Sequence, residues 1–271
     1  MPKIEQCDRL RVEVGGKDQL DMRVMEDGRR LALAEHSDFE TAPKESVDLL
    51  RTVMVAHLIA PFFPKIIETN FGVSERVFID ELYKYYGYQP PRIDLGEPVK
   101  KVIEKKSSES KSREMIKIAS AHSGGLDSAY RLVKTMNEGE RVLAVHLRNL
   151  NRKNNKGEYL ASEEQCKAWG VPYEGIRLIN NTQNTGFDTM RTRDFLLAVV
   201  TAITAYPYGA EKVLIEGGMF DDPSKGHFSE NTDAWKMFNR LLMEVNLKLE
   251  VEGVDPGDVE TVGEVLRLEI S

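Results

Sequence analysis

One short segment, Ser123-Gly124-Gly125-Leu126-Asp127-Ser128, constrains the fold of this chain more than any other. It follows an apolar run, residues 115–121, and precedes residues 129–136, which have the composition of a helix. This order predicts a strand that passes through a tight glycine-rich turn into a helix. Such a turn presents backbone N–H groups and the positive end of a helix to an anion.

The residue types in this segment suit a phosphate ligand. Gly124 and Gly125 permit a positive φ and a close approach of a phosphate to the backbone, while Ser123 and Ser128 add hydroxyl donors. A carboxylate at Asp127 would repel phosphates unless a cation lay between them. We therefore predict that Asp127 binds Mg²⁺, an ion that prefers oxygen ligands. A serine-glycine turn without a ligand is the alternative reading.

Two other nucleotide-binding motifs, the P-loop and Gly-x-Gly-x-x-Gly, are absent from the sequence. Residues 14–17, Val-Gly-Gly-Lys, contain a glycine pair and a lysine, but Asp18 stands where a P-loop requires Ser or Thr. No Gly-x-Gly-x-x-Gly occurs. The sequence therefore gives no support to a kinase or a dinucleotide-binding enzyme.

Segments of strand length alternate with segments of helical periodicity after residue 115. Strands are predicted at 116–121, 141–147, 174–179, 212–216 and 245–251, and helices at 127–136, 159–169, 189–206, 232–244 and 257–268. This alternation predicts an α/β domain in which helices cover both faces of a parallel sheet. Ligands of such sheets bind beyond the carboxyl ends of the strands, where the glycine-rich turn is expected.

The N-terminal part of the chain has a different pattern. Strands are predicted at 9–14, 20–25 and 30–34, and helices at 46–60 and 78–86, which together indicate a small α+β domain. Residues 100–114 contain six Lys or Arg and three Glu with few apolar residues, a composition typical of a solvated linker. We therefore predict a domain at 1–99, a charged linker at 100–114 and a second domain at 115–271.

Several polar residues are expected at the same edge of the sheet as the glycine-rich turn. They are His146 after the second strand of the 115–271 domain, Arg191 and Arg193 at the start of its long helix, and Glu216, Gly217, Asp221, Asp222, Lys225 and His227 after the fourth strand. Arginine at a helix start opposes the helix dipole unless it faces an anion, and Arg suits bidentate phosphate contacts. Solvated surface charge and a polar loop are the alternative readings.

Composition limits the class of protein. The net charge of −7 does not indicate a general nucleic-acid-binding surface. Two cysteines, Cys7 and Cys166, are too few for a cysteine-based zinc site or a disulfide framework. The longest apolar run, residues 53–63, is too short to span a bilayer, and the N-terminus lacks an apolar signal core. We expect a cytoplasmic protein with no membrane segment.

The glycine-rich segment resembles the pyrophosphate-binding loop of the N-type ATP pyrophosphatases, the PP-loop superfamily. Residues 191–195, Arg-x-Arg-x-Phe, and residues 213–222, with Gly217-Gly218 and then Asp221-Asp222, resemble the 7-cyano-7-deazaguanine synthase branch. The resemblance covers about residues 116–264. That synthase has a Thr-Lys-x-Glu segment and four zinc cysteines. Here Thr261-Val262-Gly263-Glu264 replaces the first, and the cysteines have no counterpart. The resemblance thus indicates a divergent relative with another acceptor, or a polypeptide whose missing part is supplied elsewhere.

The resemblance implies a Rossmann-like nucleotide-binding domain of the HUP type, with ATP and Mg²⁺ as cofactors. It implies that ATP is cleaved between the α- and β-phosphates and that a nucleophile later displaces AMP from the adenylated acceptor. The residues implied for nucleotide binding are Ser123, Gly124, Gly125, Leu126, Asp127, Ser128, His146 and Gly217. Asp127 would hold Mg²⁺, and Arg191, Arg193 and Lys225 would stabilise charge on the phosphates.

These observations favour an ATP-dependent ligase or synthase that adenylates an unidentified acceptor, most simply a carboxylate. Two alternatives stay open at this point. One is a PP-loop enzyme that modifies tRNA or transfers sulfur, which the basic linker favours and the acidic net charge opposes. The other is a module that binds ATP or AMP without chemistry. The sequence also leaves a homo-oligomer or a partner subunit open.

Overall fold

The structure of the chain is a computed structural model. It describes residues 6–15, 21–24, 30–34, 42–70, 76–95, 114–149, 155–180, 190–217 and 227–254.

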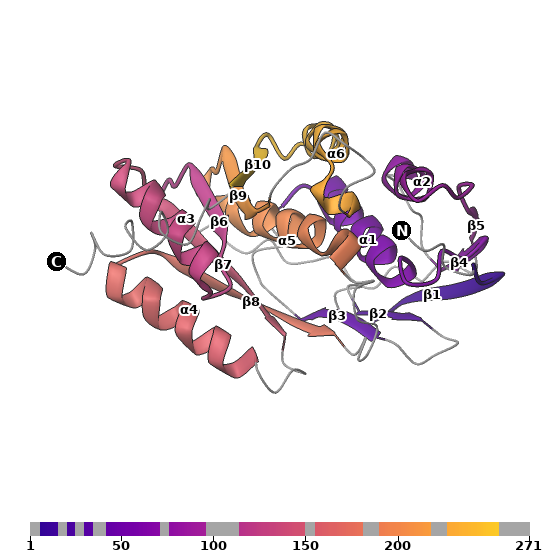
Figure 1. The fold of residues 1–271 in the computed structure, drawn as a ribbon, viewed down its shortest axis with the longest axis horizontal. Coiled ribbons are helices and arrows are strands. Elements are labelled where there is room, and N and C mark those ends of the chain that lie inside the picture. Colours follow the sequence, from indigo (N-terminus) through magenta and orange to yellow (C-terminus); the bar gives the residue numbers. More distant parts are fainter. Residues whose placement is uncertain are drawn as a thin grey trace.

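A single ten-stranded sheet runs through the molecule, in the order β10-β9-β6-β7-β8-β3-β2-β1-β4-β5 (Figure 1). The strands are β1 (Arg9–Gly15), β2 (Asp21–Val24), β3 (Arg30–Ala34), β4 (Ile66–Thr69), β5 (Arg92–Leu95), β6 (Ile118–Ala121), β7 (Val142–Asn149), β8 (Tyr173–Asn180), β9 (Lys212–Glu216) and β10 (Glu250–Val254). β10, β9, β6, β7 and β8 are parallel to one another. The protein is therefore an α/β protein with a parallel sheet, as the alternating pattern predicted.

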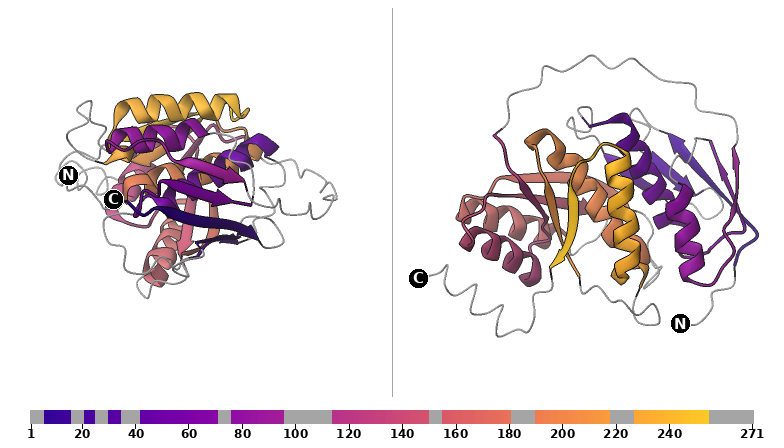
Figure 2. Two further views of the ribbon diagram at one scale, coloured as in Figure 1. Left: turned by 90° about the vertical axis from the view of Figure 1, so that its right-hand side faces the viewer. Right: turned by 90° about the horizontal axis from the view of Figure 1, so that it is seen from above.

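Helices cover both faces of this sheet. They are α1 (Lys44–Ile59), α2 (Arg76–Tyr85), α3 (Leu126–Asn137), α4 (Asn155–Trp169), α5 (Met190–Ala205) and α6 (Thr232–Glu244). α1, α2, α5 and α6 lie together on one side, and α3 and α4 lie on the other (Figures 1 and 2).

Alternate residues of β7 divide between the two cores. Leu143 and Val145 belong to the large core beneath α5, whereas Val142 and Ala144 pack with Leu132 and other residues of the α3 and α4 side. Successive side chains of a strand point to opposite faces, so a strand buried on both faces is apolar throughout.

The N-terminal strands extend the same sheet. β3 pairs with β8 in antiparallel orientation, with Leu31 opposite Asn180 and Ala34 opposite Arg177. α1 packs against α5 in the large core. The division into units 1–99 and 115–271 stays a prediction, and most of the predicted linker lies outside the described residues.

The sequence-based prediction missed two strands and misplaced a third. β4 and β5 are each four residues long; β4 pairs in parallel with β1, and β5 pairs in parallel with β4, so tertiary contacts alone define them. The last strand is Glu250–Val254, not 245–251, because Val245, Leu247 and Leu249 are buried in a non-strand segment whose alternation imitates a strand. The predicted helix 257–268 lies outside the described residues.

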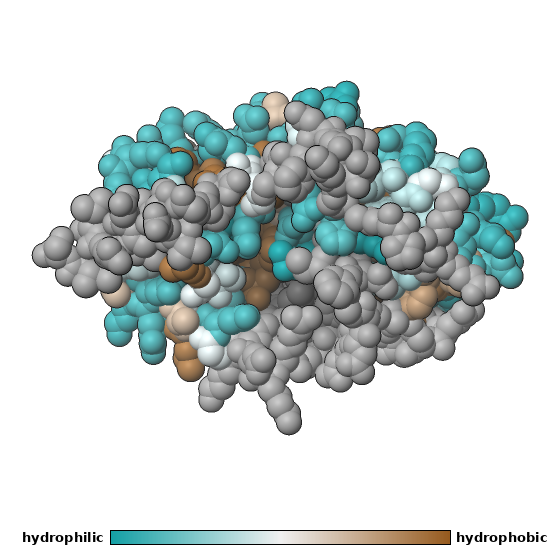
Figure 3. Space-filling view, viewed as in Figure 1, coloured by the Kyte–Doolittle hydropathy of each residue, from teal (hydrophilic) through white to brown (hydrophobic). Residues whose placement is uncertain are grey.

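None of the helices described here is long and apolar enough to cross a membrane. On the face drawn in Figure 3, most of the coloured residues are hydrophilic, and hydrophobic residues show in several small patches, one of them in a recess near the centre.

Candidate functional site

The segment of residues 123–128, here called the glycine loop, joins β6 to α3 at the carboxyl edge of the parallel strands. Gly125 is the N-cap residue of α3, and no side chain caps this helix end. The first backbone bond of the helix runs from the Ala129 N–H to the Gly125 carbonyl, at 3.0 Å. The N–H groups of the first turn therefore have no acceptor within the helix.

Side-chain donors bind four carbonyl oxygens in and next to the glycine loop. Arg131 Nη2 donates to Ala121 O at 2.7 Å, His146 Nδ1 to His122 O at 2.7 Å, Gln165 Nε2 to Gly124 O at 3.2 Å, and Ser128 Oγ to Gly125 O at 2.9 Å. The donors come from α3, β7 and α4. Because side chains of the protein already bind these carbonyl oxygens, the backbone groups of the loop that remain for a ligand are N–H donors.

Two loop N–H groups donate weakly to serine hydroxyls. The Ser123 N–H donates to Ser128 Oγ over 3.2 Å, and the Gly125 N–H donates to Ser123 Oγ over 3.3 Å. The two hydroxyl oxygens are 3.1 Å apart. These N–H bonds are at or beyond the long end of the usual range, so an anionic acceptor would compete well for the same donors.

Gly124 is required for two separate reasons. Its φ is +82°, in the left-handed region that favours glycine. A Cβ at this position would lie 2.7 Å from the Glu158 carbonyl oxygen and 2.8 Å from the Ser162 nitrogen, both in the backbone of α4. The glycine thus lets the loop pack directly on α4.

A cavity of about 110 Å³ lies behind the glycine loop. The ends of three strands and residues of three helices line it: Ala121, His122, Ser123, Arg131, Val145, His146, Leu147, Glu158, Asp194, Leu197, Ile215 and Glu216. Glu158 and Glu216 are exposed, whereas Arg131 and His122 are buried. The cavity is therefore lined by a buried cation and buried imidazoles, by the half-buried carboxylate of Asp194, and by the exposed carboxylates of Glu158 and Glu216.

His122 is neutral at neutral pH. Burial, followed by the charges of the neighbouring His146 and Arg131, lowers its pKa from 6.5 to about 4. The ring of His122 interacts with the Ser128 backbone and the Gln165 side chain, but neither of its nitrogens makes a hydrogen bond of normal geometry within the described part of the chain. Such a buried, unsatisfied polar group is uncommon in folded proteins.

The predicted metal ligand Asp127 lies in the first turn of α3, half-buried. Its carboxylate forms no hydrogen bond or ion pair with the described residues, so it is available to a cation. No group of three or more His, Cys, Asp or Glu among the residues described could hold a metal ion. Asp127 would therefore supply a single protein carboxylate, and phosphate oxygens and water would complete the coordination of Mg²⁺. This arrangement is common for this ion.

The two predicted arginines of α5 lie in different surroundings. Arg191 is buried, donates from Nη1 to Ala60 O at 3.0 Å, and lies with its guanidinium 4.7 Å from the ring centre of Tyr86. Arg193 is partly exposed and pairs with Asp194, which lines the cavity, at 3.0 Å. Arg193 thus contacts a residue of the cavity wall without lining the cavity itself, whereas Arg191 lies against the N-terminal part.

The other predicted site residues that the structure describes lie in β7, near the end of β9 and before a short helix. His146 lines the cavity, and Gly217 follows β9 directly. His227 precedes the short helix η4 (Phe228–Glu230), and its backbone N–H donates to Glu230 Oε2 at 2.7 Å. Asp221, Asp222 and Lys225 lie outside the described residues.

No protein-family profile matches this sequence, and neither does any curated protein. Several solved structures are similar, and two of them are described here. One is a predicted subunit of a tRNA methyltransferase from Methanocaldococcus jannaschii, with 18% identity, a TM-score of 0.38, and coverage of 56% of this chain and 75% of that one. The other is the U34-tRNA thiolase NcsA from Methanococcus maripaludis with its [4Fe-4S] cluster, with 14% identity, a TM-score of 0.41, and coverage of 59% of each chain.

Three residues of the site were missed by reasoning from the sequence. Gln165 and Asp194 belong to no motif, and only the packing of α4 and α5 brings them to the loop and the cavity. Arg131 did leave a signal, because it is a charged residue among the apolar positions of the helix that follows the glycine loop. A charge on the buried face of a helix is unusual unless it has a partner.

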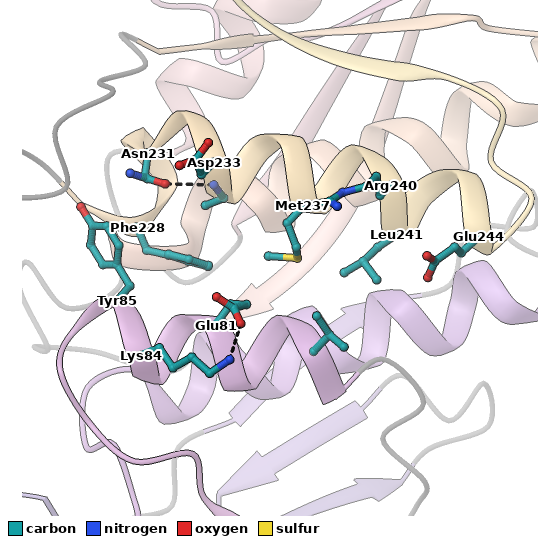
Figure 4. A pocket seen from close by; sticks show the side chains of 12 residues that line it. Glu81, Lys84, Tyr85, Phe228, Asn231, Asp233, Met237, Arg240, Leu241 and Glu244 are labelled. Atoms are coloured by element: carbon teal, nitrogen blue, oxygen red, sulfur yellow. Dashed lines mark hydrogen bonds and ion pairs between the residues drawn. The ribbon is translucent and has the colours of Figure 1, made fainter.

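A larger hollow of about 660 Å³ lies between α2 and α6 (Figure 4). Several of its polar groups are bound within their own helix. Lys84 pairs with Glu81 on α2 at 2.5 Å, and Asn231 Oδ1 accepts the Ala234 N–H at the start of α6 at 2.9 Å. The cavity behind the glycine loop is therefore the better candidate, since unsatisfied polar groups converge there.

Proposed function

We propose that this protein is an adenylating enzyme of the ATP pyrophosphatase type, in which the glycine loop binds the phosphates of ATP. One observation supports the proposal above the others. Four carbonyl groups in and beside the loop are bound by side chains of the protein, which leaves N–H groups at a helix N-terminus for an anion.

In the proposed complex, the β- and γ-phosphates accept hydrogen bonds from the loop N–H groups. They replace the weak contacts that Ser123 and Gly125 make with hydroxyl oxygens. Asp127 would hold Mg²⁺, which would neutralise part of the phosphate charge. The base would lie toward the end of β7, near His146, and Gly217 would border the site after β9.

The proposed reaction is a displacement at the α-phosphorus. An oxygen of the acceptor, most simply a carboxylate, forms a bond to this phosphorus, and the bond to the bridging oxygen of the β-phosphate breaks. Pyrophosphate leaves with the electron pair, and the loop N–H groups hold its charge. Arg193 and Lys225 are proposed to stabilise the phosphates. Arg191 is proposed to set the position of α5, because Ala60 and Tyr86 already engage it.

The identity of the acceptor determines which kind of ATP pyrophosphatase this protein is. We propose a divergent relative of the 7-cyano-7-deazaguanine synthases that works in the cytoplasm on another acceptor and then transfers the activated group to a nucleophile. No side chain is proposed as a covalent nucleophile. Burial raises the pKa of the Cys166 thiol to about 12, which disfavours the reactive thiolate.

A tRNA- or sulfur-modifying enzyme is the second candidate. The observation in its favour is the basic segment 100–114, with six Lys or Arg against three Glu. Binding of tRNA that weakens steeply with added salt would support it. With two cysteines, this chain alone does not supply the usual four-cysteine ligand set of an iron–sulfur cluster.

The proposed function is tested with ATP labelled at the α-phosphate, Mg²⁺ and a small-molecule extract as the source of acceptor. We expect the wild type to form AMP and Asp127→Asn to lose about 10²–10³ in rate, by analogy with the loss of one preorganised electrostatic contact. Asp233→Asn is the matched control, since Asp233 is an exposed aspartate in the first turn of α6. ADP as the enzyme-dependent product would rule out cleavage between the α- and β-phosphates. ATP binding without turnover in any extract would favour a non-catalytic nucleotide-binding module.

A further inference from the structure

The cavity behind the glycine loop contains a buried guanidinium that is only partly used. Arg131 is 2% exposed, and one of its nitrogens, Nη2, donates to Ala121 O at 2.7 Å. Its Nε and Nη1 atoms are buried and make no hydrogen bond within the described part of the chain. An uncompensated buried charge is costly, so a protein normally retains one only where a partner binds it.

The carboxylates near Arg131 do not meet this need. Glu216, Asp127 and Asp194 stabilise the positive charge at a distance, but none of them is hydrogen-bonded to the guanidinium. Asp194 pairs with Arg193 instead, and Glu216 is exposed. The free N–H groups of Arg131 are therefore available for acceptors that arrive with a ligand.

Shape and surroundings define the chemical class of that ligand. The cavity has a volume of about 110 Å³, enough for one small group, and its wall includes Ser123 of the glycine loop. The planar guanidinium suits two oxygens of one carboxylate or phosphoryl group. His122, neutral and unsatisfied at the same wall, can donate one further hydrogen bond.

We propose that this cavity binds a small oxyanion, held from inside the protein by the Nε–H and Nη1–H groups of Arg131. The inference rests on the proposed function for the source of the oxyanion, which is either the α-phosphate of the nucleotide or the carboxylate of the acceptor. Arg131 then has two roles. It positions the glycine loop through Ala121, and it binds the group next to the site of reaction.

Titration calorimetry of the full chain tests the proposal with four probes: AMP, adenosine, acetate and pyrophosphate. Arg131→Lys keeps the positive charge but removes the planar fork. We expect it to weaken AMP or acetate binding about tenfold or more, as the loss of a charged hydrogen bond predicts. Pyrophosphate affinity should change less than about twofold, because the loop N–H groups bind it. Lys134→Gln, which removes an exposed cation of the same helix, should change none of the affinities.

The probes separate the two sources of the oxyanion. A loss for AMP without a loss for adenosine assigns the cavity to the phosphate of the nucleotide, and a loss for acetate assigns it to the acceptor carboxylate. Equal affinities of wild type and Arg131→Lys for both probes would overturn the proposal, as would a failure of the wild type to bind either. A parallel loss for pyrophosphate and AMP would also overturn it, since Arg131 would then only position the loop.

A second variant covers the case in which Arg131→Lys does not fold. Leu197, on α5, lines the cavity and makes none of the contacts that hold the loop. Leu197→Phe should fill the cavity and weaken AMP or acetate binding while pyrophosphate binding persists. Unchanged AMP and acetate binding in this variant would contradict the proposal.

The two proposals can fail separately. If the wild type binds AMP or acetate through Arg131 but forms no AMP from ATP, the oxyanion site stands and the adenylating function fails. If the wild type forms AMP and Arg131→Lys keeps its affinities and its turnover, the adenylating function stands and the oxyanion site fails.

Discussion

At the scale of single residues, the glycine loop depends on side chains that lie far from it in the sequence. Gln165 of α4 and His146 of β7 hold two carbonyl groups that the loop itself has no means to satisfy. Ser128 closes the loop from within, through Gly125 O. A buried carbonyl without a partner would cost free energy comparable to a lost hydrogen bond, so these contacts define the path of the loop.

Gly124→Ala tests the packing of the loop on α4. Gly124 and Gly139 both have φ near +80°, but a Cβ at Gly139 would meet nothing within 4 Å. Gly139→Ala should therefore cost only the backbone strain, about 1–2 kcal/mol. Gly124→Ala should lower the free energy of unfolding by more than that, because its Cβ also meets the backbone of α4, and it should abolish ATP binding. Urea unfolding of both variants gives the comparison, and equal losses would contradict the close approach.

Two buried histidines should make stability depend on pH. Burial lowers the pKa of His57 and of His122 to about 4, from 6.5 in the unfolded chain. Between these values the unfolded state binds more protons than the folded state, so stability falls as the pH falls from 6.5 to 4. Each histidine should contribute a loss of up to roughly 3 kcal/mol over this window.

Urea unfolding at pH 7, 6 and 5 measures this dependence. His122→Gln and His57→Gln should each reduce the slope of the unfolding free energy against pH, while stability above pH 7 stays independent of these groups. A slope unchanged in both variants would show that other groups carry the pH dependence.

At the scale of elements, α5 connects the parallel sheet with the N-terminal part of the chain. Arg191 in its first turn donates a hydrogen bond to the carbonyl oxygen of Ala60, the C-cap residue of α1. Further along α5, Phe195 lies 4.1 Å from Trp235 of α6, between ring centres. The same helix presents Asp194 and Leu197 to the cavity, so its placement determines the shape of the candidate site.

The two arginines at the start of α5 should respond differently to substitution. Arg191→Met removes a buried hydrogen bond and the contact with Tyr86, so it should lower the unfolding free energy by about 2–4 kcal/mol. Arg193→Gln affects a partly exposed ion pair and should cost less than about 1 kcal/mol in stability. We expect Arg193→Gln, but not Arg191→Met measured below its melting temperature, to slow AMP formation. The reverse pattern of rates would reassign the phosphate contact to Arg191.

At the scale of the whole molecule, one sheet and one large core join residues before and after the predicted linker. β3 pairs with β8, and the large core contains residues of α1, α2, α5 and α6. A core shared in this way favours a single unfolding transition, since neither part can lose its contacts without exposing apolar surface of the other.

Leu50→Ala tests this coupling. Leu50 of α1 is fully buried in the large core, and its truncation should cost about 2–5 kcal/mol. Far-UV circular dichroism reports the whole chain, and fluorescence reports Trp169 and Trp235, which both follow the linker. Both signals should shift together in urea. A shift of the circular dichroism without a shift of the fluorescence would support independent domains.

The sequence by itself determined the α/β class, the glycine loop and the order of most elements. These features are local. The hydrophobic period, the glycine content and the residue types of a turn each determine the conformation of a few neighbouring residues along the chain. The predicted helices and strands from β6 to α6 were confirmed, apart from shifts of their ends and the displaced last strand. The loop was found because strand, glycine pair and helix start follow one another directly.

Only the tertiary structure decided the rest. The short parallel strands β4 and β5, the pairing of β3 with β8, and the surroundings of Arg131 and Arg191 all depend on residues distant in the sequence. The sequence shows only that residue 131 is an arginine and therefore charged. Its burial and its two unsatisfied nitrogens follow from how α3, β6 and β9 pack around one cavity. Pairing between distant segments is set by packing and by the satisfaction of buried polar groups, which no local pattern encodes.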